Sequence, residues 1–298
     1  MPSCPCAGFA ASTAQAADAW PEECKLQLAA SLPFTIEHGH VRIEASVNDV
    51  PRHFIIDTGG LLSSVTEKVV RSQKLKTLQI SDAYDIGGVG GGRIKRYAIA
   101  DTLTFAHLRA NDVHLLVHAD NRSDEDGVIA PDYLRNFDLE FDFAGKILNL
   151  FRPHPCPDHV IFWPGSTVVL PMDVTQQGHI RVRARLDGEE FEAMVDTGSP
   201  STLIGARTAA AKFQMEPSSE GGVTLHGGAG ATTQATAHLF HTLQLGGITI
   251  NNPPLLVAAD ETAWRSDYAD ILLGLNELSK LHVYIAYREK KVYLSPGL

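Results

Sequence analysis

Residues 54–60 read Phe-Ile-Ile-Asp-Thr-Gly-Gly, and residues 193–199 read Ala-Met-Val-Asp-Thr-Gly-Ser. In both stretches an apolar segment leads into an acid, a hydroxyl residue and a glycine. Such a segment can be buried as a strand, and the Thr-Gly turn then holds the carboxylate at the strand end, close to backbone N–H groups. A single Asp-Thr-Gly occurs by chance in turns, where Asp is a common capping residue. Two matched copies indicate a duplicated functional loop.

The two stretches belong to a longer internal repeat. Val41–Val65 maps onto Ile180–Ile204 without a gap, at a constant offset of 139 (180 − 41). Each copy begins with apolar residues that alternate with polar ones, which predicts a half-buried strand. A turn pair follows, Asn48-Asp49 in one copy and Asp187-Gly188 in the other, and such pairs are typical of tight hairpins. We therefore expect both halves to share one β-rich fold.

The rest of each copy also matches. Short helical segments are predicted over residues 66–74 and 206–212, and closing hairpins over 139–150 and 283–294. Four prolines lie between Arg152 and Gly165, and they favour a linker because they remove backbone donors. We predict a tail over residues 1–30, a first lobe over 31–153, a linker over 154–166 and a second lobe over 167–298.

Charge and hydropathy exclude several classes of partner. The net charge of −10 argues against nucleic acid, which needs a basic face. No stretch has the length of a transmembrane helix, so we expect no stable membrane insertion. The histidines form no recognisable ligand set with Cys or carboxylates, and we expect neither a metal nor another cofactor.

The N-terminal segment and the cysteines bear on the compartment. Residues 1–19 are small and apolar, and Ala14–Ala16 resembles a signal-peptidase site, although the basic start of a signal peptide is missing. Export to the periplasm or medium is one interpretation, and an Ala-rich tail on a cytoplasmic protein is the other. Cys24 and Cys156 both lie in segments outside the repeat that must cross the lobe surface. They are candidates for a disulfide if the chain is exported.

From Phe34 onward, the paired Asp-Thr-Gly loops resemble the aspartic proteases, and within them the retropepsin-like group. The chain looks like a single-chain tandem form of the bacterial type, with two homologous β-barrel lobes related by a pseudo-two-fold axis. The resemblance implies an aspartic endopeptidase, active as a monomer, whose catalytic residues are Asp57 and Asp196. Two carboxyl groups at short range share a proton, which splits their titration. Support for the catalytic loops would come from Thr58, Gly59, Thr197, Gly198 and Ser199.

Glycine clusters follow each Asp-Thr-Gly, and they align at an offset of 140 (227 − 87). They do not match a phosphate-binding loop, because no helix is predicted to begin there. They resemble flaps, hairpins that close over an extended polypeptide and pair with its backbone, although an ordinary surface loop is the alternative. The predicted substrate-binding residues are Gly87, Gly88, Val89, Gly90, Gly227, Gly228, Ala229 and Gly230.

Two positions depart from the family pattern. Gly60 stands where a Ser, Thr or Ala is usual, and Ala130 stands where the second copy has Gly274. We expect the Asp196 half to be better supported than the Asp57 half. The departures also keep open a second interpretation, a catalytically weak or inactive module that binds peptides.

Overall fold

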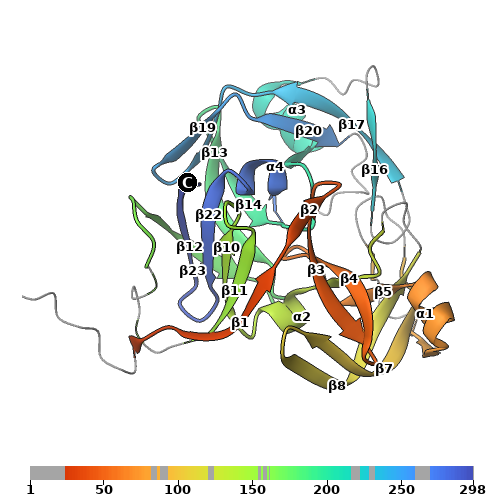
Figure 1. Cartoon of the computed structure of the whole chain (residues 1–298). Helices are drawn as coiled ribbons and strands as arrows, with labels where there is room; N and C mark the ends of the chain where they lie inside the picture. Colours follow the sequence, from red (N-terminus) through yellow and green to blue (C-terminus); the bar gives the residue numbers. More distant parts are fainter. Residues whose placement is uncertain are drawn as a thin grey trace, which may run out of the picture.

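The computed structural model describes residues 24–81, 86–87, 93–119, 124–153, 156, 160, 162–215, 222–227, 232–258 and 269–297. These residues are organised mostly as strands, in two lobes and a sheet to which both lobes contribute (Figure 1). The predicted all-β, two-lobed class is confirmed. No helix in this part of the chain is long and apolar enough to cross a membrane.

The first lobe is a closed ring of six strands. In ring order they are β3 (His40–Val47), β4 (Val50–Ile56), β9 (Gly127–Ile129), β5 (Ser64–Thr66), β8 (Leu108–His118) and β7 (Arg96–Phe105), and pairing of β7 with β3 closes the ring. β2 (Thr35–Glu37) pairs with β3, and β6 (Lys76–Gln79) pairs with β7. α1 (Glu67–Gln73) follows β5, and the hydroxyl of Thr66 caps it by accepting a hydrogen bond from the amide of Val69.

The first hairpin follows directly from the sequence pattern. Every second residue of β3, from Val41 to Val47, is buried in the lobe. Asn48 and Asp49 both have positive φ, 50° and 61°, which is the conformation of the tight turns that match strand twist. The returning strand β4 then buries its last three residues and ends at Ile56, immediately before Asp57.

The second lobe repeats this arrangement with one change. Its strands run in the order β13 (Ile180–Leu186), β14 (Glu189–Val195), β21 (Ile271–Leu273), β15 (Leu203–Gly205), β20 (Pro254–Ala258), β17 (Thr232–Leu239) and β16 (Val223–His226), and α3 (Ala206–Phe213) follows β15. β18 (Thr242–Leu245) returns to β13 and pairs with β19 (Ile248–Asn251). The long β7–β8 hairpin is thus broken into two pairs here. Asn252 has a φ of 51°, and the following Pro253 has no N–H for a ladder.

Parallel pairing places each Asp-Thr-Gly beside a second segment of its own lobe. β4 pairs with β9, and β14 pairs with β21. The amide of Asp57 donates to the carbonyl of Ile129 and that of Asp196 donates to the carbonyl of Leu273, both over 3.0 Å. Each of these strands leads into a short helix, α2 (Pro131–Leu134) or α4 (Leu275–Leu278).

A six-stranded sheet joins the lobes on the left of Figure 1. Its order is β1 (Gln27–Pro33), β11 (Ile147–Arg152), β10 (Asp138–Asp142), β22 (Leu281–Ala286), β23 (Lys291–Pro296) and β12 (Val168–Val174). The antiparallel β10–β22 pair, in which Phe141 lies opposite Val283, crosses from one half to the other. β1 begins inside the predicted tail, because pairing with β11 buries Ala30 and Leu32.

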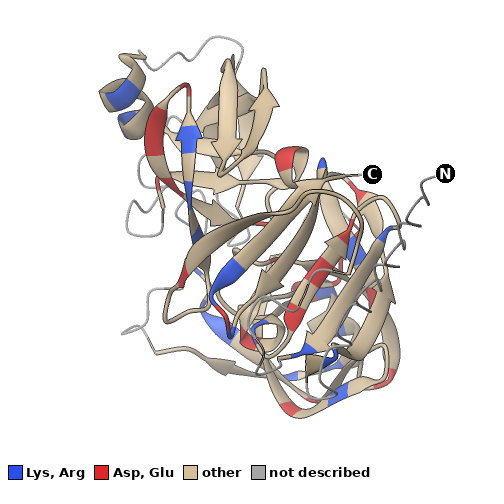
Figure 2. Ribbon diagram, turned by 90° about the vertical axis from the view of Figure 1, so that its left-hand side faces the viewer, with Lys and Arg blue, Asp and Glu red and all other residues tan. Residues whose placement is uncertain are grey.

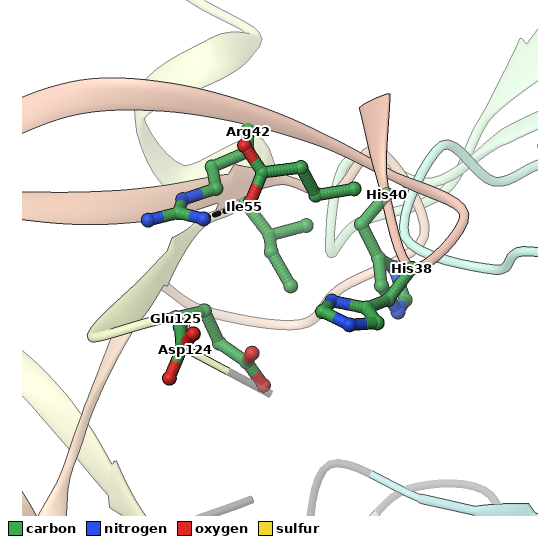
Figure 3. Close-up of a pocket in the computed structure, with 7 residues that line it drawn as sticks. His38, His40, Arg42, Ile55, Asp124 and Glu125 are labelled. Carbon is green, nitrogen blue, oxygen red and sulfur yellow. Dashed lines mark hydrogen bonds and ion pairs between the residues drawn. The ribbon is translucent and has the colours of Figure 1, made fainter. Parts of the chain in front are cut away.

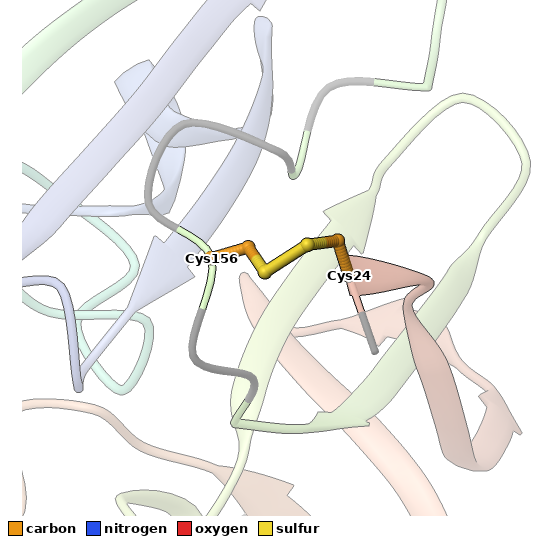
Figure 4. Close-up of a disulfide and its surroundings, with 2 residues drawn as sticks. All are labelled: Cys24 and Cys156. Atoms are coloured by element: carbon orange, nitrogen blue, oxygen red, sulfur yellow. A yellow bond between two sulfur atoms is a disulfide. The ribbon is translucent and has the colours of Figure 1, made fainter. Parts of the chain in front are cut away.

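Two described residues between β11 and β12, Val160 and Trp163, pack on this sheet. Trp163 lies in an apolar cluster with Phe151, Tyr284 and Tyr293, and its indole N–H donates to Ser295 Oγ over 2.9 Å. Cys156, in the same segment, is joined by a disulfide to Cys24 (Figure 4). The bond ties the start of the described chain to the segment between the halves.

Candidate active site

Asp57 and Asp196 come from different lobes and meet at the lobe boundary. Each follows the last residue of a buried strand, β4 or β14. Their carboxyl groups hydrogen-bond to each other. Asp196 is buried, whereas Asp57 keeps part of its surface exposed. The fold thus brings together the two carboxylates that the repeat singled out.

The threonines of the two loops are linked by reciprocal hydrogen bonds. The amide of Thr58 donates to Thr197 Oγ1 and the amide of Thr197 donates to Thr58 Oγ1, both over 3.1 Å. The Thr58 hydroxyl donates to the carbonyl of Val195 over 2.7 Å, and the Thr197 hydroxyl donates to the carbonyl of Ile56 over 2.8 Å. Both threonines are almost completely buried. Each lobe therefore satisfies polar groups at the strand end of the other.

The glycine positions of the two loops leave no space for a side chain. A β-carbon added at Gly59 would overlap the carboxyl group of Asp196, and one added at Gly198 would overlap that of Asp57. Each glycine also donates its amide to the Asp of its own loop, over 2.9 Å in both lobes. Each of the two glycines thus lies against both carboxyl groups. Only a residue without a side chain can do so.

The residues after the glycines differ between the lobes. The amide of Ser199 donates a further hydrogen bond to Asp196 Oδ1 over 3.1 Å. The Ser199 hydroxyl does not contact the carboxylate and donates instead to the carbonyl of Ser201. The amide of Gly60 points to the carbonyl of Asp57, over 3.4 Å. The Asp196 carboxylate therefore accepts two backbone hydrogen bonds from its own loop, and the Asp57 carboxylate accepts one.

Burial dominates the electrostatics of the pair. It raises the pKa of Asp57, while the hydrogen bond to Asp196, the amide of Gly59 and the nearby imidazoles of His40 and His179 counteract the rise. The pKa of Asp196 lies well above its usual range, because burial and the charge of Asp57 both disfavour its ionised form. The two groups titrate as a coupled pair, in which the raised pKa of Asp196 favours keeping one proton on the pair.

In each lobe a hydroxyl residue and an Asp or Asn side chain link the Asp-Thr-Gly loop to the strand beside it by hydrogen bonds. Ser63 donates its amide and its hydroxyl to Asp132 Oδ1, and its Oγ accepts from the amide of Ala130. In the second lobe Thr202 and Asn276 make the equivalent bonds, and Thr202 Oγ1 accepts from the amide of Gly274. These four residues were not among the predicted site residues, although the repeat offsets align them (202 − 63 = 139; 276 − 132 = 144).

Each glycine cluster falls in the sequence between two strands that pair with each other. The arms of the first are β6 and β7, extended by a bridge between Gly87 and Arg93, and those of the second are β16 and β17. Gly227 directly follows β16. The other predicted flap residues lie outside the described part of the chain: Gly88, Val89, Gly90, Gly228, Ala229 and Gly230.

Two further histidines, His40 and His179, lie beside the dyad and were not among the predicted site residues. His40 also lines a small pocket with Ile55, two residues before Asp57 (Figure 3). Among the described residues, no three His, Cys, Asp or Glu side chains are grouped as metal ligands would be. The geometry places two carboxyl groups, hydrogen-bonded to each other, where a proton can pass between them.

Comparison with known families supports the duplication. A family model described as aspartyl protease matches residues 43–132 and, a second time, residues 182–276. The starts of the two matches differ by the offset that relates the catalytic loops (182 − 43 = 139). Their ends differ by the offset that relates Asp132 to Asn276 (276 − 132 = 144), so the matches keep the register of the internal repeat. No individual curated protein matches the chain significantly.

Proposed function

Because the chain belongs to the aspartyl protease family, we propose that it is an aspartic endopeptidase, a single-chain tandem enzyme of the retropepsin-like, bacterial type. The observation that carries the proposal is the pair of carboxyl groups, one from each lobe, hydrogen-bonded to each other and held by the amides of Gly59 and Gly198. Two matched lobes supply one half-site each, so no second chain is needed to complete the pair.

In the proposed reaction the dyad begins with one shared proton. Ionised Asp57 takes a proton from a bound water, and the water oxygen attacks the scissile carbonyl carbon. Protonated Asp196 donates a hydrogen bond to the carbonyl oxygen, where negative charge develops. The tetrahedral intermediate then collapses as the proton on Asp57 passes to the leaving amide nitrogen, and the C–N bond breaks. The roles follow the pKa, which is raised more strongly at Asp196.

The proposed substrate is a polypeptide in extended conformation. The hairpins β6–β7 and β16–β17 carry the glycine clusters, whose backbone groups would pair with a strand-like substrate. Nucleic acid is a poor alternative, given the net charge of −10. In the view of Figure 2, Lys and Arg are interspersed with Asp and Glu and do not form one basic face.

A fluorogenic peptide library, assayed at acidic and neutral pH, tests the activity. We expect hydrolysis by the wild-type chain and its loss in Asp57→Asn and in Asp196→Asn. Because the two residues act as a unit, the double variant should be little worse than either single one. Asp101→Asn, at an exposed position on β7, is the matched control. If the wild type binds peptides without cleaving them, the chain is the peptide-binding module that the sequence also allowed.

We propose that the active unit is a monomer. Both carboxylates come from one chain, and hydrogen bonding between β10 and β22 joins the two halves. Specific activity should therefore stay constant on dilution, whereas a dissociating dimer would lose activity. A concentration-dependent loss, with dimers seen by light scattering, would contradict this assembly.

We also propose export to the periplasm or the medium, with the cytoplasm as the alternative. The disulfide between Cys24 and Cys156 supports export, because such bonds persist in oxidising compartments. Fractionation of the native host, with detection by antibody, tests the location.

A further inference from the structure

The repeat contains a second matched element, a Gly-His pair at the start of the first strand of each lobe. Gly39-His40 leads into β3 and Gly178-His179 leads into β13, at the same offset that relates the catalytic loops (179 − 40 = 139). His179 is buried and His40 is half-buried.

Each glycine lies in close contact with the opposite lobe. Gly39 has a φ of +81°, and a β-carbon there would lie 2.6 Å from Cβ of Pro200, which follows the second catalytic loop. Gly178 has a φ of +96°, and a β-carbon there would lie 2.8 Å from Cβ of Pro131 in the first lobe. Both positions need glycine for conformation and for space. Because each glycine lies so close to the opposite lobe, the histidine that follows it reaches the Asp-Thr-Gly loop of that lobe.

Both imidazoles bond to backbone that packs on Asp57. His179 Nε2 lies 3.0 Å from the carbonyl oxygen of Gly60, and His40 hydrogen-bonds to the backbone of Gly198. A β-carbon at Gly60 would lie 2.8 Å from Asp57 Oδ2, and one at Gly198 would overlap the same carboxyl group. Neither of these two bonds reaches Gly59, the glycine that packs on Asp196.

We infer that His40 and His179 are positioning residues for the dyad, each reaching across the lobe boundary to hold the backbone that contacts Asp57. The inference rests on the proposed function. By fixing the backbone of Gly60 and Gly198, the two imidazoles keep the loops in the geometry that the reaction needs. They also give Asp57 a different environment from Asp196, in addition to the difference between Gly60 and Ser199.

Electrostatics supports separate roles for the two carboxyl groups. Burial lowers the pKa of both imidazoles, and the charge of Asp57 only partly opposes this. At a pH above these lowered pKa values, each imidazole is neutral and donates its N–H. On acidification the imidazolium charge favours the ionised form of Asp57, the proposed base. Arg135 packs near Gly178 on the His179 side. The groups around the pocket beside His40 are Glu37, His38, Arg42, Asp124 and Glu125 (Figure 3).

Substitutions at each histidine separate hydrogen bonding from charge. His40→Phe and His179→Phe remove the donor, and we expect kcat to fall roughly tenfold with little change in KM. His40→Gln and His179→Gln keep a donor without the titratable ring, so kcat should largely recover. Their acidic limb of kcat/KM should move to higher pH, because no imidazolium then assists ionisation of Asp57. His107→Gln, at an exposed turn position, is the control and should match the wild type.

A titration that needs no activity tests the same contact. Histidine NMR signals, assigned with the glutamine variants, give the pKa of each imidazole in wild type, Asp57→Asn and Asp196→Asn. Asp57→Asn should lower both values, and Asp196→Asn should not. Equal titration in all three proteins, or phenylalanine variants as active as His107→Gln, would overturn the inference. If no peptide is cleaved but the titrations behave as expected, the proposed function fails and the contact stands.

Discussion

Gly60 and Ala130 face each other beside Asp57, and together they replace the Ser199 and Gly274 of the second lobe. A β-carbon at Gly60 would lie 3.3 Å from the methyl group of Ala130, which is fully buried. In the second lobe a β-carbon at Gly274 would overlap the carbonyl of Ser201. The two lobes thus show an exchange of glycine between the two positions, with Gly60 in the first lobe and Gly274 in the second.

The exchange predicts non-additive substitutions. Gly60→Ser should reduce activity, because its β-carbon would also approach Asp57 Oδ2 to 2.8 Å. Ala130→Gly alone should retain activity, and the double variant should recover part of what Gly60→Ser loses, because residues in contact couple. Steady-state kinetics on the three variants measures the coupling. A double variant no better than Gly60→Ser would show that the methyl group is not the obstacle.

The reciprocal threonine bonds predict that each hydroxyl stabilises the lobe junction. Thr197→Val keeps the shape but leaves the Thr58 amide and the Ile56 carbonyl without their partner, a loss on the order of 2 to 4 kcal/mol. Thr58→Val should cost a similar amount, and the pair should be non-additive because the bonds are shared. Urea unfolding measures each loss. Thr197→Ser is the control that keeps the hydroxyl, and valine variants as stable as wild type would contradict the role.

The features that the sequence predicts are those that are local in the chain or present in both copies of the repeat. The hairpins and the dyad follow from alternation, turn residues and the two copies. The partner of Ser63 is Asp132, far along the chain, so only the structure reveals the bond, although Thr202 and Asn276 repeat it. His40 and His179 were overlooked because a histidine at the start of a strand has no signature of its own. Their equal offset was the available signal.

The shared sheet was beyond the sequence for a different reason. β10 and β22 occupy equivalent places in the two halves, and nothing in either strand specifies the other as its neighbour. β1 carries an alternation too short to distinguish from an apolar tail. β1 pairs with the edge of β11, and that edge forms only when the sheet folds.

Asp138 predicts a pH dependence of stability. Its carboxylate is buried at the start of β10, where it accepts a hydrogen bond from the Tyr287 amide, and burial raises its pKa from 3.8 to about 7. Because the folded pKa lies above the unfolded one, the native state binds the extra proton. The associated stability is fully present below about pH 4 and is lost progressively as pH rises from there through about 7.

Asp138→Asn should therefore be less sensitive to pH over this window than the wild type, by up to about a few kcal/mol. The asparagine mimics the neutral acid and still offers an oxygen to Tyr287. Urea unfolding at mildly acidic and mildly basic pH gives the two slopes, and exposed Asp101→Asn should behave as wild type. Other buried carboxyl groups, including the dyad, contribute in the same direction, so the difference between the proteins isolates Asp138. Identical slopes would contradict the assignment.

The disulfide predicts a large loss of stability on reduction. Cys24 and Cys156 are separated by 132 positions in the sequence, so the bond closes a loop of nearly half the chain. Restricting so long a loop in the unfolded chain is worth ~4 to 5 kcal/mol before any cost in the native state. We expect the Cys24→Ser, Cys156→Ser double variant to unfold at a lower urea concentration than the oxidised wild type. Reductant should lower the unfolding midpoint of the wild type to the same level and leave that of the variant unchanged. Mass spectrometry of unreduced, digested protein identifies the linked peptides, and two cysteines that alkylate freely without reductant would remove both the bond and its support for export.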